Sequence, residues 1–240
     1  MTLSEEITKT LKAYYSAEGL IPGSAFACKY INNCPEPPGE SLARGMQCHI
    51  GSKYGEDGKM KILVASLDCG GGGKGTIEER RERVVSDAKK DTHNLHMTGT
   101  FKALSYFLGE KEPSKLVHYM IMTNTCKCCR ESSTRQMDYK FFQRCGEYTI
   151  AEIETIKPDV ILFQGKSSSL GCSSLLYPIA GIEDVEISHS LRLFKHNGFN
   201  CYAVLCIHPS ARFKYTKARI EFYNETLPKI ADHIKSHPLK

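Results

Sequence analysis

Asp68, Asn124 and His208 are suited to chemistry, and they stand at or just beyond the ends of short apolar runs. The chain has four such apolar runs, at residues 61–66, 117–123, 159–164 and 201–207. Their near-continuous hydrophobicity is typical of strands covered on both faces of a parallel sheet. In such sheets, sites form at the carboxyl ends of the strands. The sequence therefore predicts that the three residues meet at one edge of a sheet.

The cysteine content is the second unusual feature, because the chain has eleven cysteines. Disulfides are disfavoured in a reducing compartment, and an odd number of cysteines cannot pair completely. We therefore expect some of the thiolates to bind a metal ion or a cluster. Others, such as Cys201 and Cys206 within an apolar run, suit small buried hydrophobic positions.

Helical patterns separate the apolar runs. They span residues 3–17, 77–90, 99–109, 138–156, 182–195 and 216–235. Strands that alternate with helices predict a layered α/β fold. The length of 240 residues suits one domain over residues 1–240. Within it, residues 21–58 are rich in Pro, Gly and Cys, and we expect them to form an irregular lobe.

The net charge of +5 permits a polyanionic partner but does not require one. No run approaches the eighteen apolar residues typical of a membrane-spanning helix. The N-terminal residues include two early acids and lack the apolar core of a secretory signal. We therefore expect a cytoplasmic protein without a membrane partner.

The polar segments at the ends of the runs resemble those of the uracil-DNA glycosylase superfamily, especially its iron–sulfur branch. The first family motif is matched by SLDCG, which contains Asp68, and the last by HPS at residues 208–210. Between them, residues 123–128 match a T-N-x-x-K-C element. The resemblance implies a three-layer α/β/α fold with a central, mostly parallel four-stranded sheet.

The resemblance implies roles for these residues in breaking an N-glycosidic bond, which leaves positive charge on the sugar and negative charge on the base. Asp68 would stabilise the sugar cation and orient an attacking water. His208 would stabilise the departing base, and Asn124 would read the base edge through its amide. Taken singly, Asp68 is typical of a helix cap and Asn124 of a turn, so their combination favours catalysis.

The iron–sulfur branch holds a [4Fe-4S] cluster with four thiolates, two before the first strand and two after the second. The best match to this pattern is Cys28, Cys34, Cys128 and Cys145. Cys48, Cys126 and Cys129 remain alternative ligands. Zinc held by four thiolates is the alternative chemistry. Because glycosidic hydrolysis transfers no electrons, the expected role of the cluster is structural.

Two segments are candidates for contact with DNA. Lys166 and Ser167 begin a Gly/Ser-containing stretch that suits a phosphate, although a plain surface turn is an equal alternative. Beyond the HPS motif, the resemblance implies a loop that enters the minor groove. There Phe213 would act as a wedge, and Arg212 and Lys214 would bind phosphates. A helix start with a buried Phe213 is the alternative.

The resemblance is imperfect where the base would bind. Gly70 stands where many uracil-specific enzymes carry a bulky aromatic, and His96 and Met97 occupy the position of the aromatic that stacks on the base. A wider pocket predicts a larger base, such as glucosylated hydroxymethylcytosine of phage DNA. This substrate resembles those of the bacterial anti-phage glycosylases. Uracil excision in base-excision repair is the alternative.

Two other function classes are less well supported by the sequence. One is a non-catalytic iron–sulfur module that binds DNA, in which Asp68 and His208 would have no chemical role. The other is a nucleotide hydrolase, suggested by the glycines that precede Lys74. A phosphate-binding loop of that type needs Ser or Thr after the lysine, and Gly75 stands there. We therefore expect an enzyme without a nucleotide cofactor. We also expect it to be a monomer.

Overall fold

The computed structural model describes residues 1–34, 42–67, 75–130, 139–165 and 183–239. The helices are α1 (Leu3–Ala17), α2 (Ile77–Ala88), α3 (Leu95–Leu108), α4 (Pro113–Leu116), α5 (Tyr139–Ile156), α6 (Thr216–Glu221) and α7 (Leu227–Ser236). The strands are β1 (Leu42–Arg44), β2 (His49–Ile50), β3 (Ile62–Ser66), β4 (Met120–Asn124), β5 (Cys128–Arg130), β6 (Val160–Gln164), β7 (Glu183–Ser188), β8 (Leu191–His196) and β9 (Phe199–Cys206). Short helical turns complete the order: η1 (Gly23–Ala25), η2 (Ile31–Asn33), η4 (Phe213–Tyr215) and the π turn η5 (Phe222–Thr226).

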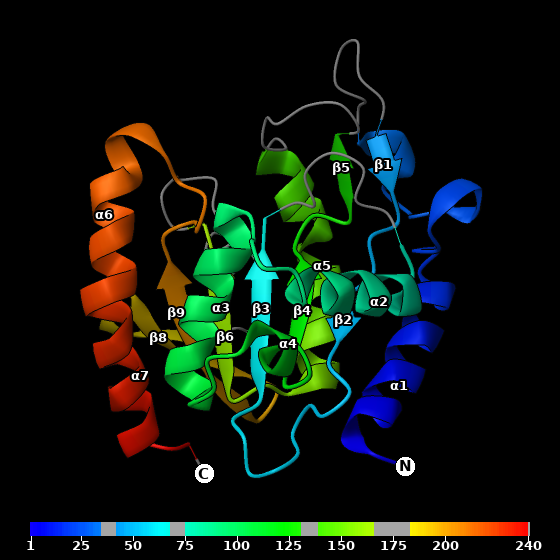
Figure 1. Ribbon diagram of the computed structural model, residues 1–240. Coiled ribbons are helices and arrows are strands. Elements are labelled where there is room, and N and C mark those ends of the chain that lie inside the picture. The colour runs from blue at the N-terminus through cyan, green and yellow to red at the C-terminus, as the bar shows by residue number, and fades with distance from the viewer. Residues whose placement is uncertain (35–41, 68–74, 131–138, 166–182, 240) are drawn as a thin grey trace.

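The main sheet has the strand order β2-β4-β3-β6-β9-β8-β7 (Figure 1). Its centre consists of β4, β3, β6 and β9, which run parallel and correspond to the four predicted strands. The predicted sheet has too few strands. In the structure, β2 on one side and β8 and β7 on the other add antiparallel pairs. Within the described residues the sheet is therefore mixed and seven-stranded.

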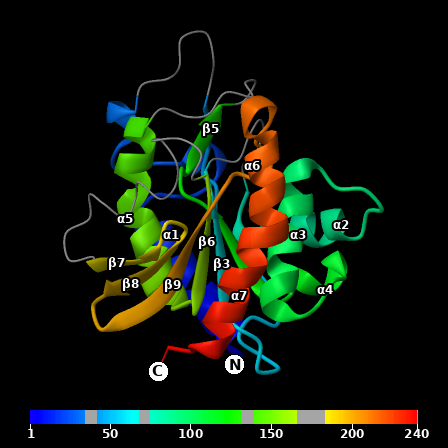
Figure 2. The same ribbon diagram turned by 90° about the vertical axis from the view of Figure 1, so that its left-hand side faces the viewer.

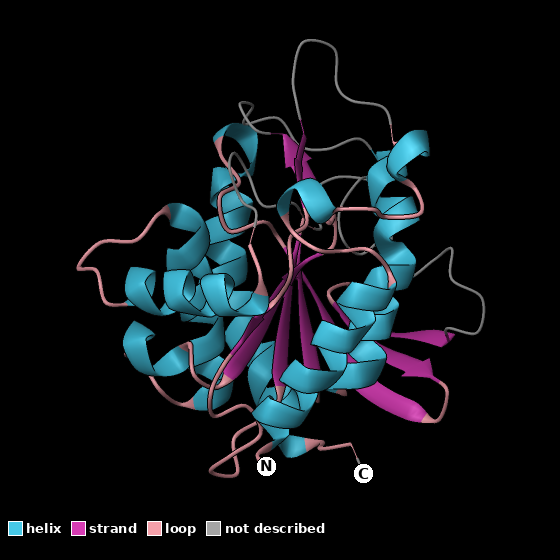
Figure 3. Cartoon of the chain, turned by 90° about the vertical axis from the view of Figure 1, so that its right-hand side faces the viewer, coloured by secondary structure: helices cyan, strands magenta, loops and turns pink. Residues whose placement is uncertain are grey.

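Helices cover both faces of the sheet, as Figures 2 and 3 show. Helices α1 and α5 pack on one face, and α3, α4 and α7 pack on the other. The predicted α/β class and its layered arrangement are confirmed. No helix among the described residues has the length and apolar character needed to cross a membrane.

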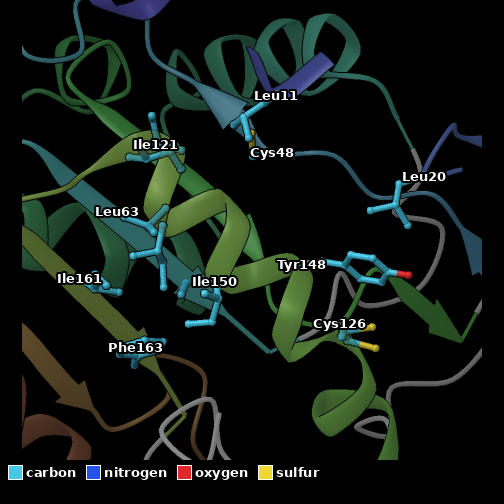
Figure 4. Packing of buried hydrophobic residues seen from close by; sticks show 14 of the residues in the cluster. Leu11, Leu20, Cys48, Leu63, Ile121, Cys126, Tyr148, Ile150, Ile161 and Phe163 are labelled. Carbon is cyan, nitrogen blue, oxygen red and sulfur yellow. The ribbon is translucent and has the colours of Figure 1, made fainter. Parts of the chain in front are cut away.

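The core follows the two-residue period of the strands. On β3, Leu63 and Ala65 pack into the cluster beneath α1 and α5, whereas Ile62 and Val64 pack into the cluster on the opposite face. Figure 4 shows Leu63 near Ile150 of α5, with Ile121 and Ile161 from the adjoining strands. Because both faces of the central strands are buried, these strands read as continuous apolar runs in the sequence.

The prediction of a helix over residues 182–195 is wrong. This part of the chain contains β7 and β8, which pair as a hairpin and extend the sheet beyond β9. Two signals favour strands: apolar and polar residues alternate from Val185 to Ser188 in β7, and Asn197-Gly198 joins β8 to β9. Asn197 and Gly198 both have positive φ, as a tight hairpin turn requires, and Asn-Gly is the preferred pair for it.

A buried ion pair ties α5 to the end of β4. Lys127 Nζ lies 2.6 Å from Glu152 Oε1, and both side chains are almost fully buried. The hydroxyl of Tyr15 on α1 donates to the same carboxylate at 2.6 Å, and that of Thr123 donates at 2.8 Å. Lys127 also donates to the backbone carbonyl of Asn124 at 2.7 Å. This network joins α1, α5 and the site edge of the sheet.

His49 on β2 makes the fold sensitive to acid. Its ring donates from Nε2 to the Val117 carbonyl at 2.8 Å, and burial lowers the pKa of His49 from 6.5 to about 3. The folded state therefore keeps this ring neutral while the unfolded chain takes up a proton below about pH 6.5. We expect the free energy of unfolding to fall between pH 6.5 and about 3, by up to about 5 kcal/mol from this residue.

Urea unfolding at several pH values between 7 and 4 tests this expectation. The His49→Gln variant keeps an amide donor for the Val117 carbonyl but cannot titrate. Its stability should therefore change less with pH than that of the wild type. Parallel pH profiles for the two proteins would show that the acid sensitivity arises elsewhere.

Candidate active site

At the carboxyl edge of the sheet, the last residues of the parallel strands lie side by side in register. The register pairs Ser66 with Asn124 on one side and with Gln164 on the other, and Gln164 with Cys206. His208 follows β9 two residues later, so it lies at the same edge as Asn124. The predicted convergence of strand ends at one edge holds for these two residues.

His208 has a defined tautomer. The backbone N–H of Ser210 donates to His208 Nδ1 at 3.1 Å, so Nδ1 is unprotonated. Burial, and secondly the nearby His96, lowers the pKa of His208 to about 4. At neutral pH the ring is therefore uncharged and carries its proton on Nε2. A neutral Nε2–H suits donation of a hydrogen bond to an atom that gains negative charge.

His96 on α3 lies against His208, with ring centroids 5.2 Å apart. Its Nε2 lies 2.7 Å from Gln164 Oε1 and 3.2 Å from Ser66 Oγ. The other end of the Gln164 amide donates to Thr100 Oγ1 at 2.9 Å, and the Thr100 hydroxyl donates to the His96 carbonyl. This chain of donors requires a proton on His96 Nε2. The sheet edge thus fixes the orientation of the His96 ring.

Helix α3 packs closely on the HPS segment. Asn94 caps the helix by accepting the Met97 N–H at 2.9 Å, which sets where its first turn begins. Gly99 allows the close approach, because a Cβ on this residue would lie 2.7 Å from Pro209 Cβ. On its other side the segment is held by Arg219, which donates to the Pro209 carbonyl at 3.0 Å.

The Gly99→Ala variant should therefore displace Pro209 and the adjacent His208. Because small misplacements of reacting groups cost up to about 100-fold in rate, we expect a loss of about 10- to 100-fold in kcat with the fold retained. Under the expectation that His208 takes part in glycosidic cleavage, base release in single turnover and circular dichroism would measure the two effects. A rate equal to that of the wild type would show that this contact does not position His208.

Asn124 is fixed at both its backbone and its side chain. Lys127 binds its backbone carbonyl, as described above, and Arg80 Nη2 donates to Asn124 Oδ1 at 3.3 Å. Arg80, on α2, is only 8% exposed. Burial lowers the pKa of Arg80 to about 10, so the guanidinium is charged at neutral pH.

Arg80 and Gln164 were not predicted as site residues. Arg80 belongs to the sequence IEERRERVV, whose charges are typical of a solvated helix face. Its position three residues after Ile77 and four before Val84, both buried, was the available signal. Gln164 was predicted to end a strand at the site edge, but its partner His96 lies 68 residues away in the sequence.

Four of the cysteines surround one small cavity. Its walls include Cys28, Cys34, Cys128 and Cys145, with Phe26, Ile31, Leu42 and Phe141 among the apolar neighbours. Hydrogen-bond donors point at three of the sulfurs: Tyr30 N–H at 3.4 Å from Cys28, Arg144 Nη1 at 3.6 Å from Cys34, and Lys127 N–H at 3.5 Å from Cys145. Such donors stabilise thiolates and cluster sulfurs, so this set fits a thiolate-bound cofactor.

The alternative cysteine ligands are placed differently. Cys48 is fully buried beside Tyr15, and burial raises the pKa of its thiol to about 12. Cys126 is fully buried and lies against Cys145 (Figure 4 shows it near Tyr148). The side chain of Cys129 lies outside the described part. Among the described residues, no three Cys, His, Asp or Glu side chains are grouped to hold a single metal ion.

The segment after the HPS motif is exposed. Phe213 is 92% exposed and has φ of 55°, a left-handed conformation that is unusual for a bulky residue. Its neighbours Arg212 and Lys214 are exposed too. Phe213 does begin a helical turn, η4, which leads into α6, but the alternative is wrong in expecting its side chain to be buried. An exposed aromatic between two cations is unusual on a protein surface and is suited to a polyanionic ligand.

The remaining predicted site residues are Asp68, Gly70, Lys166, Ser167 and Met97. Asp68, Gly70, Lys166 and Ser167 lie outside the described residues. Met97 is partly buried and packs against the hydrophobic core.

No protein-family model matches the chain, and comparison with characterised proteins gives no match either.

Proposed function

We propose that the protein is a DNA glycosylase that hydrolyses the N-glycosidic bond of a flipped pyrimidine and leaves an abasic site. The motifs resemble the iron–sulfur branch of the uracil-DNA glycosylase superfamily. The observation that carries the proposal is His208, which is neutral, protonated on Nε2 and fixed at the sheet edge that also bears Asn124. In this reading the target base leaves the duplex stack and enters at that edge.

In this proposal, one residue acts on the base of the target nucleotide and another acts on its sugar. The C1′–N bond breaks, and its electron pair leaves with the base, whose developing charge accepts a hydrogen bond from His208 Nε2–H. A preorganised donor of this kind acts chiefly in the transition state. Water adds to C1′, and Asp68, by the resemblance, stabilises the sugar cation and takes the proton of the water or directs it to solvent. The departing base finally takes up a proton from solvent.

We propose a [4Fe-4S] cluster held by Cys28, Cys34, Cys128 and Cys145, with zinc as the alternative. When bound, the cluster would supply no redox step and would link the 21–58 lobe to the segments that bear β5 and α5. A [4Fe-4S] cluster is held by four thiolates, so four thiols around one cavity suit it. Iron and sulfide analysis with a visible absorption spectrum of aerobically and anaerobically purified protein separates the two cofactors: zinc without iron would overturn the cluster assignment.

For DNA binding, we propose that Phe213 enters the minor groove while Arg212 and Lys214 contact phosphates. The exposure and strained backbone of Phe213 support this role. Backbone strain of this kind is costly, and strained residues are found mostly at functional sites. Lys166 and Ser167 remain candidate phosphate contacts by sequence alone. We expect the enzyme to act as a monomer in the cytoplasm.

The favoured substrate is a bulky modified pyrimidine, such as glucosylated hydroxymethylcytosine in phage DNA, and uracil is the alternative. Support comes from the position of the stacking aromatic, where His96 instead binds Gln164 and faces His208. An imidazole is smaller than the phenyl ring that the resemblance leads us to expect at this position, which favours a larger base. Excision of such bases would stall phage replication.

The test is base release from duplexes that carry a single uracil, 5-hydroxymethylcytosine or glucosylated 5-hydroxymethylcytosine. Alkali cleaves any abasic site formed, and mass spectrometry identifies the freed base. Release of a base by the wild type, lost in Asp68→Asn with DNA binding retained, supports the proposal. Binding without release from any duplex would overturn it in favour of a non-catalytic module. Release of uracil alone would overturn the modified-base assignment.

A further inference from the structure

Arg80 is a buried cation that the proposed chemistry does not use. In the described residues it contacts no carboxylate, and its Nε has no hydrogen-bond partner. A buried guanidinium without a counter-ion is costly, since desolvation of the charge is not repaid by pairing. Its side-chain bond to Asn124 Oδ1 therefore points to a function at the site edge.

The bond to Arg80 defines which way the Asn124 amide faces. Arginine only donates hydrogen bonds, so the amide atom facing it must be the carbonyl oxygen. The amide is planar, and its NH2 group diverges from the oxygen. The NH2 group is thus turned away from α2. Lys127 donates to the backbone carbonyl of the same residue. Hydrogen bonds therefore hold the orientation of both the main chain and the side chain of Asn124.

We propose that Arg80 is a specificity-determining residue, which presents Asn124 to the flipped base as a hydrogen-bond donor. This inference rests on the proposed glycosylase function. A cytosine-type edge offers an unprotonated N3 beside the O2 carbonyl, and both accept hydrogen bonds. Uracil has N3–H at the same place, so two donors would meet. Arg80 therefore selects cytosine-type bases over uracil-type bases that carry the same substituent.

The size of the preference follows from the cost of one unpaired buried donor. That cost corresponds to a factor of about 10 to 100 in rate. Removal of the guanidinium would let the Asn124 amide turn over, and Oδ1 could then accept from N3–H. The discrimination should collapse without loss of the ability to bind DNA.

The test compares two duplexes with the same C5 substituent, one on cytosine and one on uracil, in single-turnover base release. The 5-hydroxymethyl pair and the glucosylated pair are both used. For the wild type we expect a cytosine-to-uracil rate ratio of at least about 10. For Arg80→Met the ratio should fall at least tenfold, through slower release from the cytosine duplex and faster release from the uracil duplex.

Arg81→Met is the matched control. Arg81 lies on the same helix, but its guanidinium binds the Ile50 carbonyl at 2.8 Å and Thr8 Oγ1 at 3.3 Å. This variant loses the same charge and should keep the wild-type ratio. If Arg80→Met does not fold, Arg80→Lys retains a buried cation without the fork that reaches Asn124, and its ratio should fall as well.

The outcomes separate this inference from the proposed function. A wild type that releases no base from any duplex would overturn the glycosylase proposal itself. A wild type that releases bases but prefers the uracil duplex would overturn only the role of Arg80. An unchanged ratio in folded Arg80→Met, or an equal fall in Arg81→Met, would do the same.

Discussion

The His208→Ala variant is expected to lose about 100- to 1,000-fold in the rate of base release, with DNA binding retained. The reason is that His208 Nε2–H is a fixed donor directed at charge that develops only in the transition state, and removal of one such donor costs that much. The measurement is the single-turnover rate on the preferred duplex, with binding followed separately by fluorescence anisotropy.

The pH dependence distinguishes a neutral donor from a charged one. Because burial and His96 lower the pKa of His208 to about 4, the ring stays neutral from pH 8 down to about 5. The rate should therefore not rise as pH falls through 6.5, and a decline due to His208 should begin only near pH 4. A rate that increases between pH 7 and 5.5 would show that imidazolium is the active form.

His118→Ala is the control for loss of a histidine. His118 precedes β4 and thus lies at the amino end of the sheet, where it contacts Ser52. This variant should release base at the wild-type rate. An equal loss in both variants would point to a general effect on folding.

The Lys127→Met variant is expected to lower the free energy of unfolding by about 3–5 kcal/mol, because it leaves the Glu152 carboxylate buried without its cation. Two hydroxyls, from Tyr15 and Thr123, would remain as its donors. Urea unfolding at neutral pH measures the change. Since Lys127 also holds the carbonyl of Asn124, we expect slower base release even where the variant is fully folded.

A double variant separates the unpaired charge from the loss of packing. Lys127→Met combined with Glu152→Gln removes both charges and should recover part of the lost stability. The exposed pair Lys12–Glu78 provides the control, since Lys12→Met should cost no more than about 1 kcal/mol. A cost in Lys127→Met as small as in Lys12→Met would contradict the importance of the buried pair.

Expectations from sequence succeeded where a local pattern has one structural solution. The central strands and most helices follow from apolar runs and from helical spacing, because a strand buried on both faces has few polar positions. The hairpin of β7 and β8 was predicted as a helix, although alternation from Val185 to Ser188 in β7 and the Asn197-Gly198 turn favour strands. The buried residues of β8, Leu191 and Phe194, are three positions apart, a spacing that also suits one face of a helix.

By itself, the sequence placed Asn124 and His208 at one edge, because parallel strands end together whatever surrounds them. It also singled out the four cysteines that share a cavity. Only the tertiary structure decided the state of these groups. The neutral His208 depends on burial and on His96, which the sequence separates by more than a hundred residues. Likewise, the orientation of Asn124 depends on Arg80, a charge that looks solvated until α2 packs on the sheet. Protonation and amide orientation are set by neighbours in space, and no local spacing encodes them.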